Sequence, residues 1–547
     1  MRATVTNQPK SVRHITRSCE THQLKPFWDT SAELAHHFGW GGRIRTFEWR
    51  IQSPLPYHLA TPQHVDRIRP GIATDVKCPV QSKSRSVYSR HMAGAPRVVI
   101  LAAGQGTRMR SAMPKVLHPL GGRPMLSYAV ALAREISPEP PIVVINPAQL
   151  DVRAAVDGAA QCVQQDEPRG TGDAVRSVPE QLRTHGPVVV LGADVPLLNA
   201  ETVRRLVDRH RESDAAVTLL TVNPSDASGL GRVYRDANGR VARIVEERDL
   251  PAGTPPLEAN AGVYVFSGER LWPALDRVSN NNAQGEYYLT DVIELLAPDV
   301  QAVSVDDSTE VLGINDRRQL AQAEAVVRRR TLDRLMLAGV TIEDPATAYI
   351  DADVEVGADS VVRAMTCIRG ATRIGRDADI GPGARLRDVQ AGDSVRIGAS
   401  DLDECRLGDG VWIGAHCRVR PNTTLGSGVQ LGTHAEVKNS NVGPGTHLNH
   451  FSCVLDSDVG RDVNVGAGTV TCNYDGSAKH RTRIGDEVFI GSNSTLVAPL
   501  NLGDRCYIAA GSVITEDVPA GALAVGRARQ RNIERWVERR RGLRSNG

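Results

Sequence analysis

Short apolar runs alternate with longer polar-rich segments across the middle of the 547-residue chain. Apolar runs of about four to eight residues that end in glycine or polar residues are typical of buried parallel strands. The pattern predicts strands at 98–101, 142–145, 188–191, 217–222 and 263–266, and helices that include 125–134 and 200–211. Alternating strands and helices predict an α/β domain with a Rossmann-like, mainly parallel sheet, which we assign to residues 94–317.

A single helix is predicted after this domain. Residues 316–337 are rich in Arg, Ala, Leu and Glu and contain neither Gly nor Pro. This composition favours an uninterrupted helix. We therefore assign residues 318–339 to a linker helix.

From residue 340 onward, aliphatic residues recur every six positions and are often followed by glycine. A six-residue period matches neither a helix nor a long strand, and each glycine would cost a helix about 1 kcal/mol. The period is typical of a triangular β-solenoid, in which one short strand forms each face and the aliphatic side chain points inward. We assign residues 340–547 to such a solenoid, with a core that includes Leu407, Ile413, Val419, Leu425, Leu431, Val437, Ile484, Ile490, Leu496, Leu502, Ile508 and Ile514.

Two segments of this region depart from the repeat. The six-residue register breaks between Thr471 and Arg483, which predicts a loop expelled from the coils, and such loops often carry function. The end of the chain from Arg527 is strongly basic, and we interpret it as a solvated tail.

Charge and cysteine usage narrow the possible partners. The formal net charge of +2 gives no overall field that would attract nucleic acid or a membrane surface. No apolar run approaches the roughly 18 residues of a membrane span. The nine cysteines form no CxxC pair, and their odd number in a large chain favours reduced thiols. We therefore expect a cytoplasmic protein with no nucleic-acid and no membrane partner.

Residues 1–93 differ from the rest of the chain. They hold three of the six Trp and seven of the fifteen His, and Lys and Arg outnumber Asp and Glu there. One interpretation is a basic arm for targeting or nucleic-acid binding. The interpretations we favour are a disordered extension, or a start codon placed too far upstream with Met92 as the natural start.

The segment from Leu101 to Lys115 carries candidate phosphate-binding chemistry. Gly104 and Gly106 follow the first strand and let the backbone come close to a polyphosphate. Arg108 and Lys115 add positive charge for a developing pyrophosphate. A glycine-rich turn alone also occurs in ordinary strand–helix connections, so the surrounding string decides between the two interpretations.

That string, LAAGQGTRMRSAMPKVLHPLGGRPM at 101–125, resembles the L-x-x-G-x-G-x-R-M and P-K signature of nucleotide-sugar pyrophosphorylases. Strings at 164–174, 191–197 and 280–291 extend the similarity. Together with the solenoid, residues 96–530 resemble the bifunctional N-acetylglucosamine-1-phosphate uridyltransferases/glucosamine-1-phosphate acetyltransferases. The resemblance implies that the solenoid is a left-handed parallel β-helix.

The resemblance implies a first site in which UTP and N-acetylglucosamine-1-phosphate react by in-line substitution and release pyrophosphate. Lys115 and Arg108 would stabilise charge, and Asp194 and Asn315 would hold Mg²⁺. Asp194 ends an apolar strand, which suits a metal ligand, although an ordinary helix cap would explain it as well. The residues implied to bind UTP or the product are Leu101, Ala102, Ala103, Gly104, Lys115, Gln165, Gly170, Thr171, Asp194, Gly231, Glu246, Asn260 and Asn315.

The resemblance implies a second site in the solenoid, where acetyl-CoA acetylates glucosamine-1-phosphate. A free amine must attack, so a base with a pKa near neutrality helps. His450 matches the general base of the family and Glu436 the carboxylate that orients it. The implied glucosamine-1-phosphate residues are Arg420, Lys438, Cys453, Asn464, Asn473 and Tyr474, and the implied acetyl-CoA residues are Ala467, Asn473, Tyr474, Ser492, Ala510 and Arg527.

One segment of the second site departs from the family pattern. Cys453 stands where the family has a tyrosine that reaches the substrate phosphate, and Leu455 replaces a glycine. A thiol does not supply the hydrogen bond of a phenol at that reach. We therefore expect weaker affinity for glucosamine-1-phosphate.

Three hypotheses follow for the whole chain. The first is a homotrimeric enzyme that acetylates glucosamine-1-phosphate and then uridylylates the product, feeding bacterial cell-wall synthesis. The second is a uridyltransferase whose solenoid is only a trimerisation scaffold; Cys453 favours it, while His450 and Asn473 argue against it. The third is a non-catalytic regulatory subunit of the same architecture, which Lys115 and Asp194 argue against.

Overall fold

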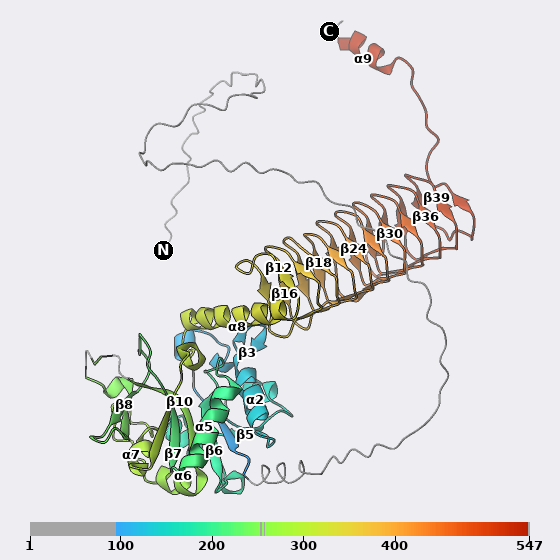
Figure 1. Ribbon diagram of the computed structural model, residues 1–547. Helices are drawn as coiled ribbons and strands as arrows, with labels where there is room; N and C mark the ends of the chain where they lie inside the picture. The colour runs from blue at the N-terminus through green and yellow to red at the C-terminus, as the bar shows by residue number, and fades with distance from the viewer. Residues whose placement is uncertain (1–93, 252–253, 256–257, 545–547) are drawn as a thin grey trace, which may run out of the picture. The chain divides into compact units, whose positions relative to one another are not determined.

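The computed structural model describes residues 94–251, 254–255 and 258–544 (Figure 1). The predictions for residues 1–93 lie outside the described residues. Among the helices of the described ranges, none combines the length and the apolar character that a membrane crossing requires.

The first domain is built on one twisted sheet with antiparallel additions. Its strand order is β11 (Val300–Ser304), β7 (Val217–Val222), β10 (Ala259–Ser267), β6 (Pro187–Gly192), β1 (Arg97–Leu101), β4 (Ile142–Ile145) and β5 (Gln161–Gln164). Neighbours run parallel, except that β10 is antiparallel to β6 and β7. The strands β8 (Arg232–Arg235) and β9 (Val241–Val245) form an antiparallel pair beside β10.

Helices cover both faces of this sheet. The helices α2 (Met125–Ile136), α3 (Leu150–Ala155) and α5 (Ala200–Ser213) pack on one face, and α4 (Thr171–Arg176), α6 (Gly268–Leu275) and α7 (Asp291–Leu296) on the other. Alternate residues of β1 serve the two layers, because Val98 and Ile100 face the first and Val99 the second. The predicted α/β domain with a mainly parallel sheet is confirmed, while the antiparallel course of β10 was not predicted.

A long helix, α8 (Arg317–Leu337), follows the first domain, where the sequence predicts one uninterrupted helix. The Asp316 side chain caps this helix by accepting hydrogen bonds from the backbone N–H groups of Arg318 and Gln319. The side-chain oxygen of Gln319 in turn accepts from the backbone N–H of Asp316. This reciprocal capping box satisfies donors that a helix start leaves unpaired. Val327 packs with the first domain, whereas Leu332 and Leu335 join the core of the solenoid.

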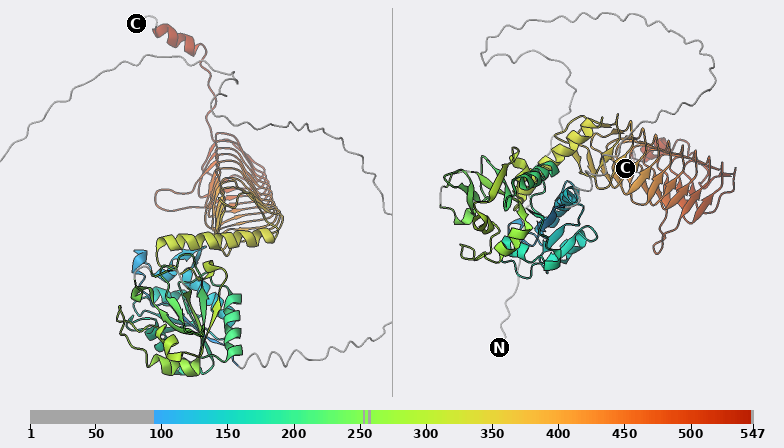
Figure 2. Two further views of the ribbon diagram at one scale, coloured as in Figure 1. Left: turned by 60° about the vertical axis from the view of Figure 1, so that its left-hand side comes forward. Right: turned by 60° about the horizontal axis from the view of Figure 1, so that its bottom comes forward.

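The second domain is a solenoid of three parallel sheets (Figure 1). The first sheet has 11 strands, from β12 (Thr341–Ile342) to β41 (Leu523–Ala524). The second has 10, from β13 (Tyr349–Ile350) to β40 (Val513–Ile514), and the third has nine, from β14 (Glu355–Val356) to β38 (Leu500–Leu502). Figure 2 shows the triangular outline of the coils, and the fold is the predicted left-handed parallel β-helix.

The six-residue repeat fills the interior of this triangle. In β27 (Gln430–Leu431), Leu431 is fully buried and Gln430 is exposed, and β24 (Trp412–Ile413) shows the same alternation. Each buried aliphatic stacks on that of the next coil, as Ile413 does on Leu431. The twelve aliphatic positions named from the sequence all belong to this buried core, so that prediction is confirmed.

One loop leaves the triangular outline (Figure 2). It spans residues 473–481, between β34 (Val470–Cys472) and β35 (Thr482–Ile484), where the sequence predicts an expelled segment. We call it the excursion loop. Near the end of the chain, α9 (Trp536–Arg544) has exposed side chains through Arg541, as predicted for a solvated tail.

We predict that Leu431→Ala lowers the free energy of unfolding by about 2–5 kcal/mol, because it removes a fully buried side chain and leaves a cavity. Gln430→Ala, at the exposed position of the same strand, should cost less than about 0.5 kcal/mol. Denaturant unfolding of both variants checks this, and equal losses would contradict the inward stacking.

Candidate active sites

A cationic turn lies at the carboxyl end of β1. Gly106 has a left-handed φ of 62°, and a Cβ there would lie 2.5 Å from the Cβ of Lys115. Glycine is therefore required for the turn to close on Lys115. Arg108 lies in the short 3-10 helix Thr107–Met109, with its side chain exposed.

Lys115 joins three segments that are distant in sequence. Its Nζ donates to Oδ2 of Asp194 at 2.6 Å and to Oδ1 of Asn315 at 3.2 Å. The backbone reinforces this arrangement, because the N–H of Ile314 donates to the carbonyl of Asp194 at 2.9 Å. The Lys115 side chain is only 11% exposed, so the ion pair is largely shielded from solvent.

The oxygens around this ammonium group suit a divalent cation. Asp194 offers a carboxylate and Asn315 an amide oxygen, which are hard ligands of the kind that Mg²⁺ prefers. The described residues contain no group of three or more His, Cys, Asp or Glu side chains placed to hold a metal. A metal at this position would therefore take its remaining ligands from phosphate and water, as Mg²⁺ usually does in nucleotide sites.

The structure joins two predicted strings, 164–174 and 280–291, into one wall. Gly170 has φ 113°, and a Cβ there would lie 2.5 Å from the carbonyl oxygen of Tyr287. The N–H of Leu289 donates to Oγ1 of Thr171 at 3.0 Å. Gln165 is buried, and its Nε2 donates to Oδ2 of Asp173 at 2.9 Å. The predicted base-reading residues therefore have fixed orientations.

A second wall carries the residues predicted to bind the sugar. Nδ2 of Asn260, on β10, donates to the Tyr264 hydroxyl at 2.7 Å. Glu246 follows β9, and its carboxylate accepts from Oγ1 of Thr290 at 2.9 Å. Burial raises the pKa of Glu246 above its usual value. A Cβ at Gly231 would lie 3.0 Å from Cγ2 of Ile244, so glycine lets this loop lie close to the end of β9, just before Glu246.

The second candidate site begins on the outer face of the second solenoid sheet. The strands β25 (Arg418–Val419), β28 (Glu436–Lys438), β31 (Cys453–Leu455) and β34 lie side by side there. Arg420 donates to Oε1 of Glu436 at 2.9 Å, and Cys453 lies beside Glu436 in register. The outer face of these coils therefore carries Arg420, Glu436 and Cys453, while the aliphatic side chains point into the core.

His450 lies at a corner of the solenoid, just after β30 (His447–Leu448). The N–H of Thr433 donates to its Nδ1 at 3.1 Å, and Oγ1 of Thr433 is 3.0 Å from the same nitrogen. A Cβ at Gly432 would come within 3.0 Å of Nδ1, so a glycine makes room for the ring. Glu436 is predicted to orient His450, but its carboxylate accepts a hydrogen bond from Arg420. The contact to the His450 ring comes from Thr433.

The same corner continues along the solenoid. His450 follows the buried Leu448 by two residues, and the predicted acetyl-CoA residues Ala467, Ser492 and Ala510 follow their own buried aliphatics by two. The aliphatics are in register from coil to coil. These four positions therefore form one line along a solenoid corner. Arg527 lies beyond the last strand, and its side chain is exposed.

The excursion loop carries two further predicted residues, Asn473 and Tyr474. Nδ2 of Asn473 donates to the Asp456 carboxylate. Within the loop, Asp475 accepts from the N–H groups of Ser477 and Ala478 at 2.7 Å and pairs with His480 at 2.7 Å. The loop is therefore held by its own hydrogen bonds and by a contact to the coil beneath it.

Comparisons with known proteins identify the family. Residues 98–296 match the MobA-like NTP transferase domain, 404–439 the bacterial transferase hexapeptide (six repeats), and 481–516 the hexapeptide repeat of succinyl-transferase. The bifunctional protein GlmU of Streptomyces avermitilis is 44% identical over 454 residues, which cover 81% of this chain and 94% of that protein. The chain belongs to the GlmU family.

Other GlmU proteins show the same degree of similarity. That of Mycobacterium marinum is 44% identical over 461 residues, covering 82% of this chain and 94% of the relative. That of Thermotoga maritima is 44% identical over 446 residues, covering 81% and 99%. The family predicted from the sequence is confirmed, and with it the assignment of one chain as an enzyme with a uridyltransferase and an acetyltransferase function.

Sequence reasoning in this GlmU family member missed several residues that hold the predicted ones. Thr433 contacts His450, Thr290 contacts Glu246, and Asp173 contacts Gln165. Thr290 and Asp173 lie inside the strings 280–291 and 164–174, which resemble the family, so the sequence could have pointed to them. Thr433 lies one coil before His450, and only the coil length of the solenoid could have pointed to it.

We predict a pH-dependent effect at Asp291, the first residue of α7. Burial, followed by Glu246 and other carboxylates, raises its pKa to about 6 from 3.8. The Asp291 carboxyl therefore binds its proton more tightly in the folded chain than in the unfolded chain. The contribution of protonated Asp291 to stability is complete below pH 3.8 and is lost as pH rises through 6. Asp291→Asn should stabilise the protein above pH 6 by about 1 kcal/mol, allowing for solvent screening, and should change little near pH 3.8.

Thermal unfolding across this pH range measures the effect. Glu269→Gln, which changes an exposed carboxylate on α6, is the matched control and should show no such pH dependence. A stability difference for Asp291→Asn that stays constant with pH would contradict the assignment.

Proposed function

We propose that the first domain transfers a uridylyl group from UTP to N-acetylglucosamine-1-phosphate and that the solenoid acetylates glucosamine-1-phosphate with acetyl-CoA. The observation that carries the first activity is the convergence of Lys115, Asp194 and Asn315 beside the turn after β1. A cation and two hard oxygen ligands at the carboxyl edge of a parallel sheet suit a nucleoside triphosphate and its Mg²⁺.

The sugar phosphate is already a nucleophile, so uridylyl transfer needs positioning and charge stabilisation more than a strong base. Asp194 and Asn315 would hold Mg²⁺, which supplies a Lewis acid for the phosphate oxygens. Lys115 and Arg108 orient the leaving pyrophosphate. Gln165, Gly170 and Thr171 contact the base, and Gly231, Glu246 and Asn260 contact the sugar.

Leu101, Ala102, Ala103 and Gly104 bring the backbone of the turn against the nucleotide. The acidic lining of the sugar wall favours a ligand that donates hydroxyl groups, because the Glu246 carboxylate is buried and accepts from Thr290. The two walls and the cationic turn thus provide separate contacts for base, phosphates and sugar.

In the solenoid, His450 takes a proton from the amine of glucosamine-1-phosphate. While its Nδ1 accepts the Thr433 N–H, the neutral ring carries its proton on Nε2 and offers no free lone pair. We propose that the ring turns away from Thr433 when substrates bind. Arg420 and Lys438 bind the phosphate, and Glu436 sets the position of Arg420 through their ion pair.

The remaining solenoid residues divide between the two substrates. Cys453, Asn464 and the loop residues Asn473 and Tyr474 line the acceptor. The corner line of Ala467, Ser492 and Ala510 lies along the solenoid and suits an elongated molecule such as acetyl-CoA, with Arg527 near its end. Acetylation precedes uridylylation, since the first domain takes the acetylated sugar.

We also propose a homotrimer that acts in the cytoplasm, where nucleoside triphosphates and acetyl-CoA are available. Exposed apolar side chains on the outer face of the first solenoid sheet support self-association, since monomers rarely expose such rows. Phe489, Tyr507 and Leu523 lie on three adjacent strands, and Trp412 lies on the same sheet four strands earlier. The division into residues 94–317, 318–339 and 340–547 is part of the same proposal.

Two assays of the full chain test the proposed function. The first measures pyrophosphate release from UTP and N-acetylglucosamine-1-phosphate with Mg²⁺, and the second measures thiol release from acetyl-CoA and glucosamine-1-phosphate. Asp194→Asn should abolish only the first activity and His450→Ala only the second. Pyrophosphate release without thiol release would refute the proposed acetyl transfer and favour a uridyltransferase whose solenoid is only a scaffold.

We predict that Lys115→Met tightens Mn²⁺ binding to the nucleotide-free chain by about tenfold, although it lowers pyrophosphate release. The Lys115 ammonium group lies on the oxygens of Asp194 and Asn315 and therefore competes with a metal. Titration calorimetry with Mn²⁺ measures the binding. Arg108→Met should lower pyrophosphate release without changing Mn²⁺ affinity, and unchanged affinity in Lys115→Met would rule out the competition.

A second prediction concerns Cys453, which is half-buried beside Glu436. Cys453→Tyr should lower the KM for glucosamine-1-phosphate by about tenfold, because a phenol can donate to the phosphate where a thiol does not. Cys453→Phe supplies the ring without the hydroxyl and should give no such gain. Steady-state kinetics of the acetyl reaction decide, and equal KM values for the Tyr and Phe variants would count against a phosphate contact.

A further inference from the structure

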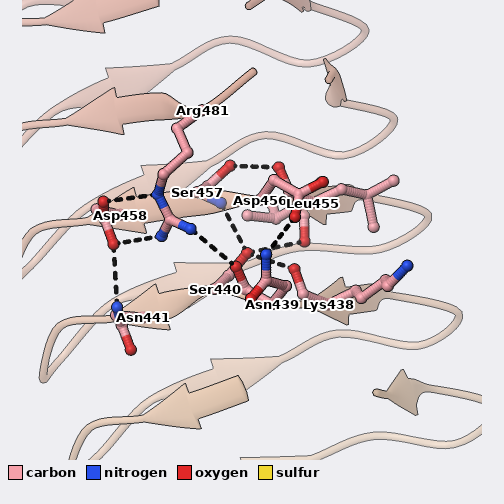
Figure 3. Close-up of polar contacts among 10 residues, drawn as sticks. Lys438, Asn439, Ser440, Asn441, Leu455, Asp456, Ser457, Asp458 and Arg481 are labelled. Carbon is pink, nitrogen blue, oxygen red and sulfur yellow. Dashed lines mark hydrogen bonds and ion pairs between the residues drawn. The ribbon is translucent and has the colours of Figure 1, made fainter. Parts of the chain in front are cut away.

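Two aspartates on one turn of the solenoid hold both ends of the excursion loop. Asp456 accepts a hydrogen bond from Asn473, where the loop begins. Asp458 accepts two from Arg481, where it ends, at 3.0 and 2.5 Å. Figure 3 shows Asp456 and Asp458 with Asn439 and Arg481 around them. The excursion is therefore clamped at its base and not merely tethered by the chain.

Asp456 is the more constrained of the two. Only 5% of the surface of Asp456 is exposed. Its two carboxylate oxygens have different partners, since Oδ1 accepts from Nδ2 of Asn439 and Oδ2 accepts from Nδ2 of Asn473. Its backbone is tied as well, because its N–H donates to the carbonyl of Lys438 at 3.0 Å. Although burial opposes it, the hydrogen bonds from the two amides lower the pKa of Asp456.

An ionised carboxylate only accepts hydrogen bonds, so it sets the orientation of both amides. Asn473 must turn its Nδ2 toward Asp456, and its Oδ1 is then directed elsewhere. An amide oxygen accepts from an N–H, which is what the amine of an amino sugar offers. If Asn473 turned over, its NH₂ group would face that amine, donor against donor.

We propose that Asp456 is a positioning residue for acetyl transfer, which fixes the Asn473 amide so that its oxygen faces the amine of the acceptor. The proposal rests on the proposed acetyltransferase function of the solenoid. Asp456 itself lies beneath the loop and acts through Asn473. Asp458 and Arg481 hold the other end of the loop and do not determine the amide orientation.

The local hydrogen-bond pattern offers a swap test. In Asp456→Asn, a single carboxamide oxygen faces two NH₂ donors, so Asn439 or Asn473 must turn over. Adding Asn439→Asp restores a complete network: the carboxylate introduced at position 439 accepts from the amide introduced at position 456, and the oxygen of that amide accepts from Asn473. Adding Asn473→Asp instead also completes the network, but it removes the amide that the proposal requires.

The experiment measures acetyl-transfer kinetics, pyrophosphate release and thermal unfolding for the full chain and these three variants. Asp456→Asn should lower kcat/KM for acetyl transfer about tenfold or more, the size of a lost hydrogen bond to a charged group, and leave pyrophosphate release unchanged. The Asn439→Asp swap should recover acetyl transfer to within about threefold of the natural chain. The Asn473→Asp swap should recover thermal stability but not acetyl transfer.

Two results would overturn the proposal. One is an Asp456→Asn variant with acetyl transfer equal to that of the natural chain. The other is equal acetyl transfer in the two swaps, which would make Asp456 a structural clamp only. Failure of the natural chain to acetylate glucosamine-1-phosphate would instead refute the proposed function, and it is seen before any variant is compared.

Discussion

Coil-to-coil stacking of one aliphatic residue per short strand is the constraint on which the second domain depends. Each buried residue, such as Ile413 or Leu431, lies directly against its counterpart in the next coil. The parallel hydrogen bonds fix the same register on all three sheets. Residues at equal offsets from these aliphatics are therefore brought into lines along the solenoid, whatever their chemistry. The corner line that holds His450, Ala467, Ser492 and Ala510 is a direct result of this register.

In the first domain no repeat aligns the residues of the candidate site, because they come from segments about 80 to 200 positions apart. The edge of a parallel sheet collects the ends of β1 and β6, and Asn315, the residue before the cap of α8, lies beside them. Lys115 neutralises the Asp194 carboxylate at that junction. This proposed metal ligand is thus kept paired in the free protein, which avoids the cost of a partly buried lone charge.

Local patterns in the sequence were sufficient to predict most of the architecture. Apolar runs placed β4 and β7 at their observed bounds, the six-residue period identified the solenoid core, and its interruption located the excursion loop. The antiparallel course of β10 has no local signal, because strand direction depends on the connection and not on the strand. Its apolar sequence would suit either direction.

The supporting contacts of the sites were harder to predict for a related reason. Thr433 with His450, and Asp456 with Asn473, are pairs that meet one coil apart, about a full turn along the chain. Short polar residues at the solenoid corners look alike in the sequence whether they orient a neighbour or face water. Which amide or ring turns toward which partner is decided by the stack, and only the structure shows it.

The excursion loop leaves and rejoins the solenoid at a corner, between strands that keep their register with the coils on both sides. Between the clamped ends of the loop, residues can therefore be added or exchanged without shifting any core contact. In such a fold, the stability of the scaffold and the chemistry of the loop can change independently. A solenoid of this kind can accept new substrates through changes in one insertion, while the coils that carry it stay the same.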